Sequence, residues 1–229
     1  MKYYRTMFSL IILAFASCTD IPDFELANTI DFGQIRLADS TIKKLPYNKF
    51  PQQFIFMDSA NNEYEADIRI TIEIFNRFSR SYQYDNSEDQ FTIMYQSQSL
   101  STDIIIQDLD MEFTMLTSVN VYNENIFDRD YNNLKLSDYT NISVSTPLLP
   151  LSGDVSITAH RRGIENDIPE TVPPMESFTI NGKEYKDVYT NEGTAFGTLF
   201  DNTLIYFNYE HGIIAFKDKV SGTTYFLKE

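Results

Sequence analysis

The chain has 229 residues, of which 42% are hydrophobic and 22% are charged, with 18 basic residues against 33 acidic ones. This composition is typical of a globular protein, so it excludes wholesale disorder and a collagen-like structure. The formal charge of −15 disfavours a nucleic-acid partner, because such binding depends on basic groups that neutralise phosphates. The single cysteine excludes an intramolecular disulfide and a cysteine-rich metal site, and the sequence predicts no cofactor.

The N-terminus is predicted to be a signal peptide over residues 1–17. Lys2 and Arg5 precede an apolar run of about ten residues, which is too short for a bilayer core that needs about 20. The run ends in Phe-Ala-Ser-Cys over residues 15–18, which resembles the lipobox of bacterial lipoproteins. The resemblance implies cleavage before Cys18, lipidation of its thiol by acyl chains such as palmitate, and a membrane anchor.

A secreted protein that is cleaved near Ser17 and keeps a free thiol is the alternative. Removing 17 of 229 residues leaves 212, and losing two basic residues with them lowers the formal charge from −15 to −17. Residues 18–26 would then form a short acidic tether. This tether resembles the signal that places lipoproteins of the Bacteroidota on the outer face of the outer membrane, with attachment facing the periplasm as the alternative.

The body of the chain is predicted to be one all-β domain over residues 27–229. Strand-like alternation over 67–74, 107–115 and 154–160 places apolar side chains on one face, and Asn181-Gly182 predicts a tight hairpin. A sustained helical period is absent from the mature chain, so we expect antiparallel strands in a β-sandwich or a partly open barrel. The proline-rich segment 162–177 is predicted to be a crossover within this domain. A separate domain formed by the last residues, about 50 of them, is the alternative.

Three segments of the body carry a further resemblance. Leu-Pro-Tyr over 45–47, Phe-Ile-Phe-Met-Asp-Ser over 54–59, and residues 205–216 with their Ile-Ile-Ala-Phe ending are similar to uncharacterised outer-membrane lipoproteins of the Bacteroidota. The resemblance implies a cell-envelope habitat and an all-β fold. It implies no activity, because that group has none to transfer.

Side chains that could carry chemistry are few. His160, on a predicted strand, and His211, in a predicted turn, are interpreted as solvated residues, because nucleophilic catalysis needs a histidine positioned beside the nucleophile. Asp108, Asp110 and Glu112 lie two residues apart and would share one face of a strand. They could bind Ca²⁺ or supply the paired carboxylates of a glycan hydrolase, and the simpler interpretation is a solvated polar face.

Other patterns are shorter. Residues 128–139 begin like an EF-hand loop but lack its turn glycine and its final glutamate. Ser40 and Ser59 each follow an aspartate in a motif that resembles the O-glycosylation site of exported Bacteroidota proteins. Tyrosines could form a stacking surface for a glycan or peptide, although tyrosine is also simply favourable in strands. The candidates for such a surface are Tyr82, Tyr84, Tyr122, Tyr131 and Tyr139.

These observations predict a lipid-anchored, outer-membrane lipoprotein with a non-catalytic binding or structural role, whose partner at the cell surface would be a glycan or a protein. One alternative is a carboxylate-dependent glycan hydrolase, which needs two carboxylates in one cleft. The other is a barrel that carries a small apolar ligand, which needs a dry internal cavity on the order of hundreds of Å³.

Overall fold

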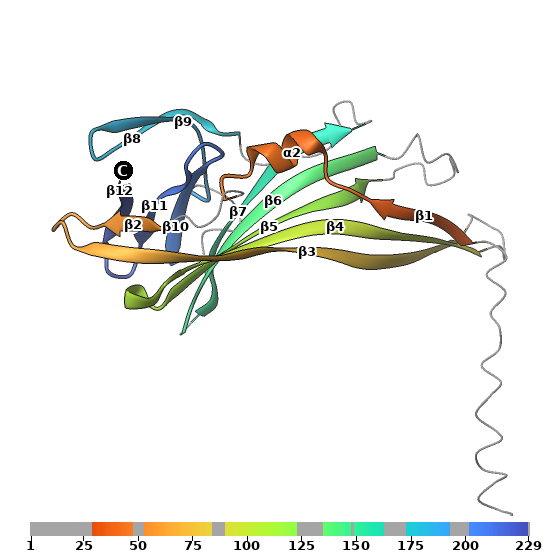
Figure 1. Cartoon of the computed structure of the whole chain (residues 1–229), viewed down its shortest axis with the longest axis horizontal. Coiled ribbons are helices and arrows are strands. Elements are labelled where there is room, and N and C mark those ends of the chain that lie inside the picture. The colour runs from red at the N-terminus through yellow and green to blue at the C-terminus, as the bar shows by residue number, and fades with distance from the viewer. Residues whose placement is uncertain are drawn as a thin grey trace, which may run out of the picture. The chain divides into compact units, whose positions relative to one another are not determined.

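A computed structural model describes residues 29–47, 53–83, 90–122, 135–147, 149–162, 173–192 and 202–228. Nearly all of them lie in strands, which confirms the predicted all-β class (Figure 1). The chain divides into a small unit of residues 1–31 and 79–94 and a large unit of residues 32–78 and 95–229. In the small unit, the hydroxyls of Ser81 and Thr92 share a hydrogen bond of 3.0 Å. The core and the candidate site described below belong to the large unit.

The described residues form one twelve-stranded sheet with the order β7-β6-β5-β4-β3-β2-β12-β11-β10-β9-β8, and β1 pairs with β4. The elements are β1 (Thr29–Ile35), α2 (Asp39–Lys44), β2 (Phe54–Met57), β3 (Glu63–Gln83), β4 (Gln90–Ile106), the 3-10 turn η1 (Gln107–Leu109), β5 (Met111–Tyr122), β6 (Lys135–Thr146), β7 (Leu149–Arg162), β8 (Met175–Ile180), β9 (Lys183–Thr190), β10 (Thr203–Asn208), β11 (Gly212–Asp218) and β12 (Thr224–Lys228). The predicted crossover therefore leads from β7 to β8, and its residues 163–172 lie outside the described ranges.

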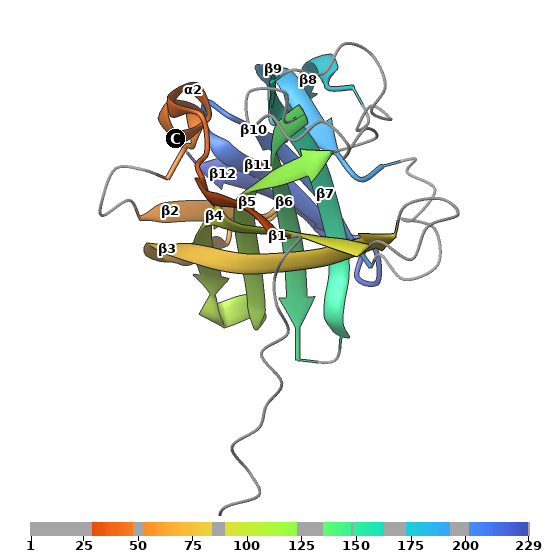
Figure 2. The same ribbon diagram turned by 90° about the vertical axis from the view of Figure 1, so that its right-hand side faces the viewer.

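The antiparallel sheet of the large unit curls into a half-barrel, as expected for a partly open barrel (Figure 2). Side chains from its two halves pack against each other in the interior. Ile104, Phe113 and Ile142 come from β4, β5 and β6, and Phe207 and Phe216 come from β10 and β11. Each of these side chains is at most 2% exposed. The described interior is thus filled by side chains, which gives the apolar-carrier alternative no support.

Strands β7 and β10 approach each other closely at Gly153. A Cβ atom at this position would overlap the carbonyl oxygen of Thr203, so space, and not backbone conformation, requires glycine here. Asn191 lies at the same place, where its Nδ2 donates to the Thr203 carbonyl and its Oδ1 accepts from the N–H of Ile205, both at 2.9 Å. The amide of Asn191 therefore continues the hydrogen bonding of β10 beyond the end of β9.

Strands β10 and β11 are buried on both faces. Ile205 and Phe207 face the half-barrel core, whereas Leu204 and Tyr206 face the β8–β9 hairpin. In that second cluster, Tyr206 stacks on Phe178 with the ring centroids 4.5 Å apart. Because both faces are covered, the side chains of β10 form a continuous buried run and do not alternate.

The segments that carry the lipoprotein resemblance meet in the core. The Tyr47 hydroxyl accepts the backbone N–H of Ile213 at 2.8 Å, directly after Gly212. Phe56 meets Phe216 edge-on, with a centroid distance of 5.2 Å. These residues hold β2 and β11 against each other, so in this structure their contribution is to packing.

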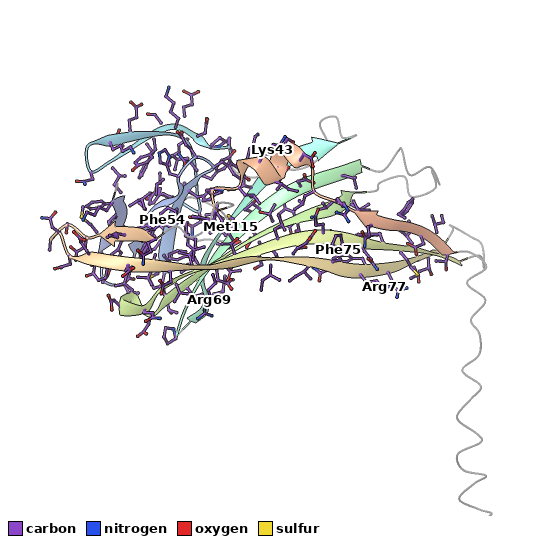
Figure 3. All side chains as sticks on the ribbon, viewed as in Figure 1. Lys43, Phe54, Arg69, Phe75, Arg77 and Met115 are labelled. Atoms are coloured by element: carbon purple, nitrogen blue, oxygen red, sulfur yellow. The ribbon has the colours of Figure 1, made fainter. Side chains whose placement is uncertain are left out.

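Helix α2 was not indicated by the sequence, because its six residues are too few to show a helical period. A fully buried carboxylate on β6 binds its first turn: Asp138 accepts the N–H of Ala38 at 2.8 Å and the hydroxyl of Thr41 at 2.7 Å. Figure 3 labels Lys43 on this helix, where it is exposed, and Met115 of β5, which lies in the core. The helix is therefore positioned by a distant strand and not by its own capping residues.

The strand predicted over residues 67–74 is confirmed as part of β3. Its apolar residues, however, do not form one buried face. Ile68 packs against the core, whereas Ile72 and Ile74 are 56% and 41% exposed. Glu73 accepts a hydrogen bond of 2.7 Å from Gln98, which is on the core-facing side of β4. The alternation therefore continues along β3 while its burial ends, and Ile72 and Ile74 face solvent.

Candidate functional site

The turns at one end of the half-barrel enclose a pocket of about 450 Å³. Antiparallel pairing brings the β4–β5, β6–β7 and β11–β12 turns to this end, together with the start of β10. Leu109, Asp110 and Met111 line the pocket from the first turn, and Thr146 and Pro147 line it from the second. The volume lies within the range of small-molecule sites, which is about 300–1,000 Å³.

The opposite wall comes from the C-terminal strands. Asn202 and Thr203 line it at the start of β10. Asp218 ends β11, Val220 lies in the turn that follows, and Tyr225 belongs to β12. Val220 is 77% exposed at the mouth, whereas Tyr225 is only 9% exposed. The pocket therefore opens to solvent and combines an apolar wall with two carboxylates.

Hydrogen bonds hold the β11–β12 wall in place. The carboxylate of Asp218 accepts the backbone N–H groups of Val220 at 2.9 Å and of Ser221 at 3.3 Å. The N–H of Lys219 donates to the carbonyl of Asn202 at 2.7 Å, which ties this turn to the segment before β10. Because these bonds join groups of the protein to one another, the wall is formed before any ligand arrives.

Tyr225 is fixed by two aromatic neighbours. Its ring stacks on Phe216 at 4.7 Å and 17°, and meets Tyr64 edge-on at 5.3 Å and 83°. Burial raises the pKa of Tyr225 above its ordinary value, and the charge of Asp218 adds to this rise. The phenol is therefore neutral at physiological pH and offers a rigid, largely apolar surface to the pocket.

The prediction of one continuous strand over residues 107–115 is wrong. Gln107–Leu109 form a 3-10 turn, and Asp110 has a left-handed φ of 49°. The chain reverses here, so that Ile106 pairs with Met111 across the start of the β4–β5 ladder. The alternation of apolar and polar residues persisted through a tight turn, and alternation alone does not distinguish such a turn from a strand.

The expected carboxylate face is corrected accordingly. Asp108 lies in the 3-10 turn, Asp110 follows it, and Glu112 lies on β5, so the three do not project from one strand face. Of these three residues, Asp110 alone is among the residues that line the pocket. Asp218 is the second aspartate in that lining. Within the described ranges, no group of three or more His, Cys, Asp or Glu side chains is arranged to hold a metal ion.

Several predicted residues fall outside the described parts of the chain. Cys18 and residues 128–134 of the EF-hand-like segment are among them, and so is the side chain of His160, whereas residues 135–139 belong to β6. His211 lies in the β10–β11 turn, where its ring meets Tyr185 edge-on at 5.3 Å. Among the candidate tyrosines, Tyr139 is partly buried on β6. The side chains of the other four candidates are not among those that the structure describes: Tyr82, Tyr84, Tyr122 and Tyr131.

Both predicted glycosylation serines are exposed. Ser40 lies on α2, and Ser59 lies in the loop between β2 and β3. Asp58 shapes that loop, because its Oδ1 accepts the N–H of Ala60 at 2.8 Å and of Asn62 at 2.9 Å. Modification of either serine stays a prediction.

The Asp58 loop should make stability depend on pH. Hydrogen bonds, first of all from the side chain of Asn62, lower the pKa of the Asp58 carboxyl below its ordinary value of 3.8. A carboxyl whose pKa is lower in the folded state than in the unfolded state stabilises the protein fully at a pH above its unfolded-state pKa. This stabilisation is lost as the pH falls through the folded-state pKa. We expect acidification from about pH 5 to about pH 2 to lower the melting temperature of the wild type more than that of Asp58→Asn.

Thermal unfolding followed by circular dichroism measures this difference. Glu184→Gln, at an exposed carboxylate of β9, is the matched control and should follow the wild type. Equal acid sensitivity of Asp58→Asn and the wild type would show that these hydrogen bonds do not favour the ionised form.

The fold and the pocket define an all-β half-barrel protein with a preformed, partly acidic site at one end. No family model, curated protein or solved structure matches the chain. In the described part of the chain, no helix has the length and apolar character needed to cross a membrane.

Proposed function

We propose that this protein is a lipid-anchored lipoprotein of the outer membrane that binds a small molecule without transforming it. The signal peptide predicted over residues 1–17, directly before Cys18, supports the anchor. The pocket supports the binding role and is the observation that carries it, since its volume of about 450 Å³ and its fixed walls suit a small ligand. A glycan or a protein at the cell surface stays the alternative partner.

The anchor rests on one side chain. Cys18→Ala should move the protein from the membrane fraction to the soluble fraction and abolish its labelling with a radioactive or alkyne-tagged fatty acid, because no thiol remains to be acylated. Cell fractionation and immunoblotting measure the first effect. Thr19→Ala, which keeps the cysteine, should behave like the wild type. A mutant that stays in the membrane, together with a wild type that takes up no label, would contradict the anchor.

The acidic tether over residues 18–26 supports display on the outer face of the outer membrane. On that face, protease added to intact cells should degrade the protein. Protection in intact cells, followed by degradation after the outer membrane is permeabilised, would instead place the protein on the periplasmic side.

Ligand binding can be followed by a single fluorophore, since the chain contains no tryptophan. Val220→Trp places one at the exposed mouth of the pocket, and Ile72→Trp places one at an exposed position of β3, outside the pocket lining. A small ligand of the pocket should change the emission of the first variant and leave that of the second unchanged. Ligands that alter both alike, or neither, would argue against the pocket.

One observation favours the alternative function of a glycan hydrolase: the two aspartates Asp110 and Asp218 line the same pocket. A hydrolase uses such a pair as acid and as base or nucleophile. Release of reducing sugar from glycans by the wild type, and its loss in Asp110→Asn, would replace the non-catalytic proposal with this one.

A further inference from the structure

We infer that the ligand of this pocket is a small organic cation, in which an ammonium group is attached to an apolar body. The inference rests on the proposed binding function and names its ligand class. Three features of the pocket support it: the sign of its charge, the position of its apolar surface and the rigidity of its walls.

The charge of the pocket is negative. Asp110 and Asp218 are both on its wall, and the described lining residues include no Lys, Arg or His. Within the described ranges, the carboxylate of Asp110 is exposed and makes no ion pair with another residue. An ammonium group would form a charge-assisted hydrogen bond with this carboxylate, and such bonds are about twice as strong as neutral ones. An anionic ligand would meet repulsion from both carboxylates.

The whole chain strengthens this preference. The mature protein would carry a charge of −17, the full chain's −15 less the two basic residues of the signal peptide. Clefts lined by one sign of charge concentrate ligands of the opposite sign. A cation is therefore enriched near the pocket, whereas a neutral polyol gains nothing from the field.

The apolar surface lies beside the carboxylates. Leu109 and Met111 flank Asp110 in the chain, and Tyr225 approaches from β12. The stacking of Tyr225 on Phe216 holds its ring in place, so an apolar body can pack on it without ordering a mobile side chain. A tyrosine ring also attracts a cation that lies over its face. The ligand therefore gains from carrying both an ammonium group and an apolar body.

A second described pocket lacks this combination. That pocket, of about 220 Å³, lies between the β8–β9 turn and β12, and Lys183 and Lys228 line it. Its lysines give it the opposite character, although Lys228 is paired with Glu63 at 2.6 Å. Of these two pockets, the one at the β11–β12 end therefore has the more favourable environment for a cation.

Three probes of similar shape test the ligand class: phenethylammonium, the neutral 2-phenylethanol and the anionic 3-phenylpropionate. Each is titrated into the Val220→Trp variant, purified at full length in a non-ionic detergent, and into the wild type by calorimetry. We expect phenethylammonium to bind most tightly, with an affinity that falls as salt is added because charged contacts are screened. The anion should not compete with it.

Two matched substitutions locate the charge. Asp110→Asn should weaken phenethylammonium binding about tenfold, the effect of one charge-assisted hydrogen bond, and should leave 2-phenylethanol unaffected. Asp108→Asn removes a carboxylate from the same turn, outside the pocket lining, and should change neither. Circular dichroism checks that both variants fold.

The possible failures are distinguishable. If 2-phenylethanol or 3-phenylpropionate binds as tightly as the cation, the cation inference is overturned and the binding function stands. If the cation binds but Asp110→Asn has no effect, the charge of this pocket does not select it and the inference is overturned as well. If none of the three probes binds and a wider set of sugars and lipids also fails, the proposed binding function falls with it.

Discussion

Gly212→Ala is expected to destabilise the protein by about 4 kcal/mol, a large loss against the roughly 5–15 kcal/mol by which a typical domain is stable. Gly212 has a φ of 82°, a left-handed conformation that costs an alanine about 1–2 kcal/mol. Its new Cβ would also overlap the hydroxyl of Tyr47. Forcing such an overlap in a packed core costs about 1–3 kcal/mol more.

Tyr47 cannot move aside without further loss. Its hydroxyl accepts the N–H of Ile213 at 2.8 Å, and its ring meets Phe54 edge-on at 5.4 Å. Only 4% of the residue is exposed, and burial raises the pKa of its phenol well above the usual range. A displaced Tyr47 would leave a buried N–H without its acceptor, which costs about 1–3 kcal/mol.

Gly182→Ala is the matched control for this prediction. Gly182 has a similar φ of 78°, but no atom lies within 4 Å of a Cβ built there. The control should therefore lose only the conformational part, about 1 kcal/mol. Urea denaturation gives both free energies of unfolding. Equal losses in the two variants would show that the overlap with Tyr47 is not the cause.

Turn chemistry predicted the hairpins well, because it acts through the residues of the turn alone. Asn181 and Gly182 both have positive φ, at 49° and 78°, as a two-residue hairpin between β8 and β9 requires. The strand of residues 154–160 was predicted with its buried side chains, and Val155 and Ile157 are indeed buried. Local propensity and tertiary structure agree at these places.

The pattern failed where tertiary structure decided the outcome. Nothing in the alternation of β3 reveals that Ile72 and Ile74 are exposed, because the burial of a strand face depends on the distant elements that cover it. Likewise, residues 107–110 alternate as a strand does but form the turn that pairs Ile106 with Met111. Single-sequence periodicity carries no information on where a long hairpin reverses.

The site was only partly predictable for the same reason. Asp110 was singled out, but with the wrong companions, since Asp108 and Glu112 do not line the pocket. Asp218 and Tyr225 come from strands more than 100 residues further along the chain, and only the closure of the half-barrel brings them to Asp110. The turn Asp-Lys-Val-Ser-Gly over 218–222 was recognisable, and its aspartate was the available signal for this wall.

Asp138→Ala should cost about 3 kcal/mol, the second large effect we expect. The carboxylate is fully buried on β6 and accepts the hydroxyl of Thr41 at 2.7 Å and the N–H of Ala38 at 2.8 Å. Its removal leaves both donors at the start of α2 without this acceptor, and a buried unsatisfied donor costs about 1–3 kcal/mol. Asp138→Asn keeps one carbonyl oxygen and should lose roughly half as much.

A double-mutant cycle with Thr41→Val separates the hydrogen bond from general loss of packing. Thr41→Val removes the hydroxyl and keeps the shape of a side chain that is only 1% exposed. If the Asp138–Thr41 bond holds α2 on β6, the double mutant should lose about 1–2 kcal/mol less stability than the two single mutants lose together. The second substitution then has no hydrogen bond left to break. Additive losses would mean that the two residues stabilise the protein independently. Helix α2 would then be held mainly by its Ile42, which packs against the apolar cluster of Ile35, Leu37, Val119 and Leu136.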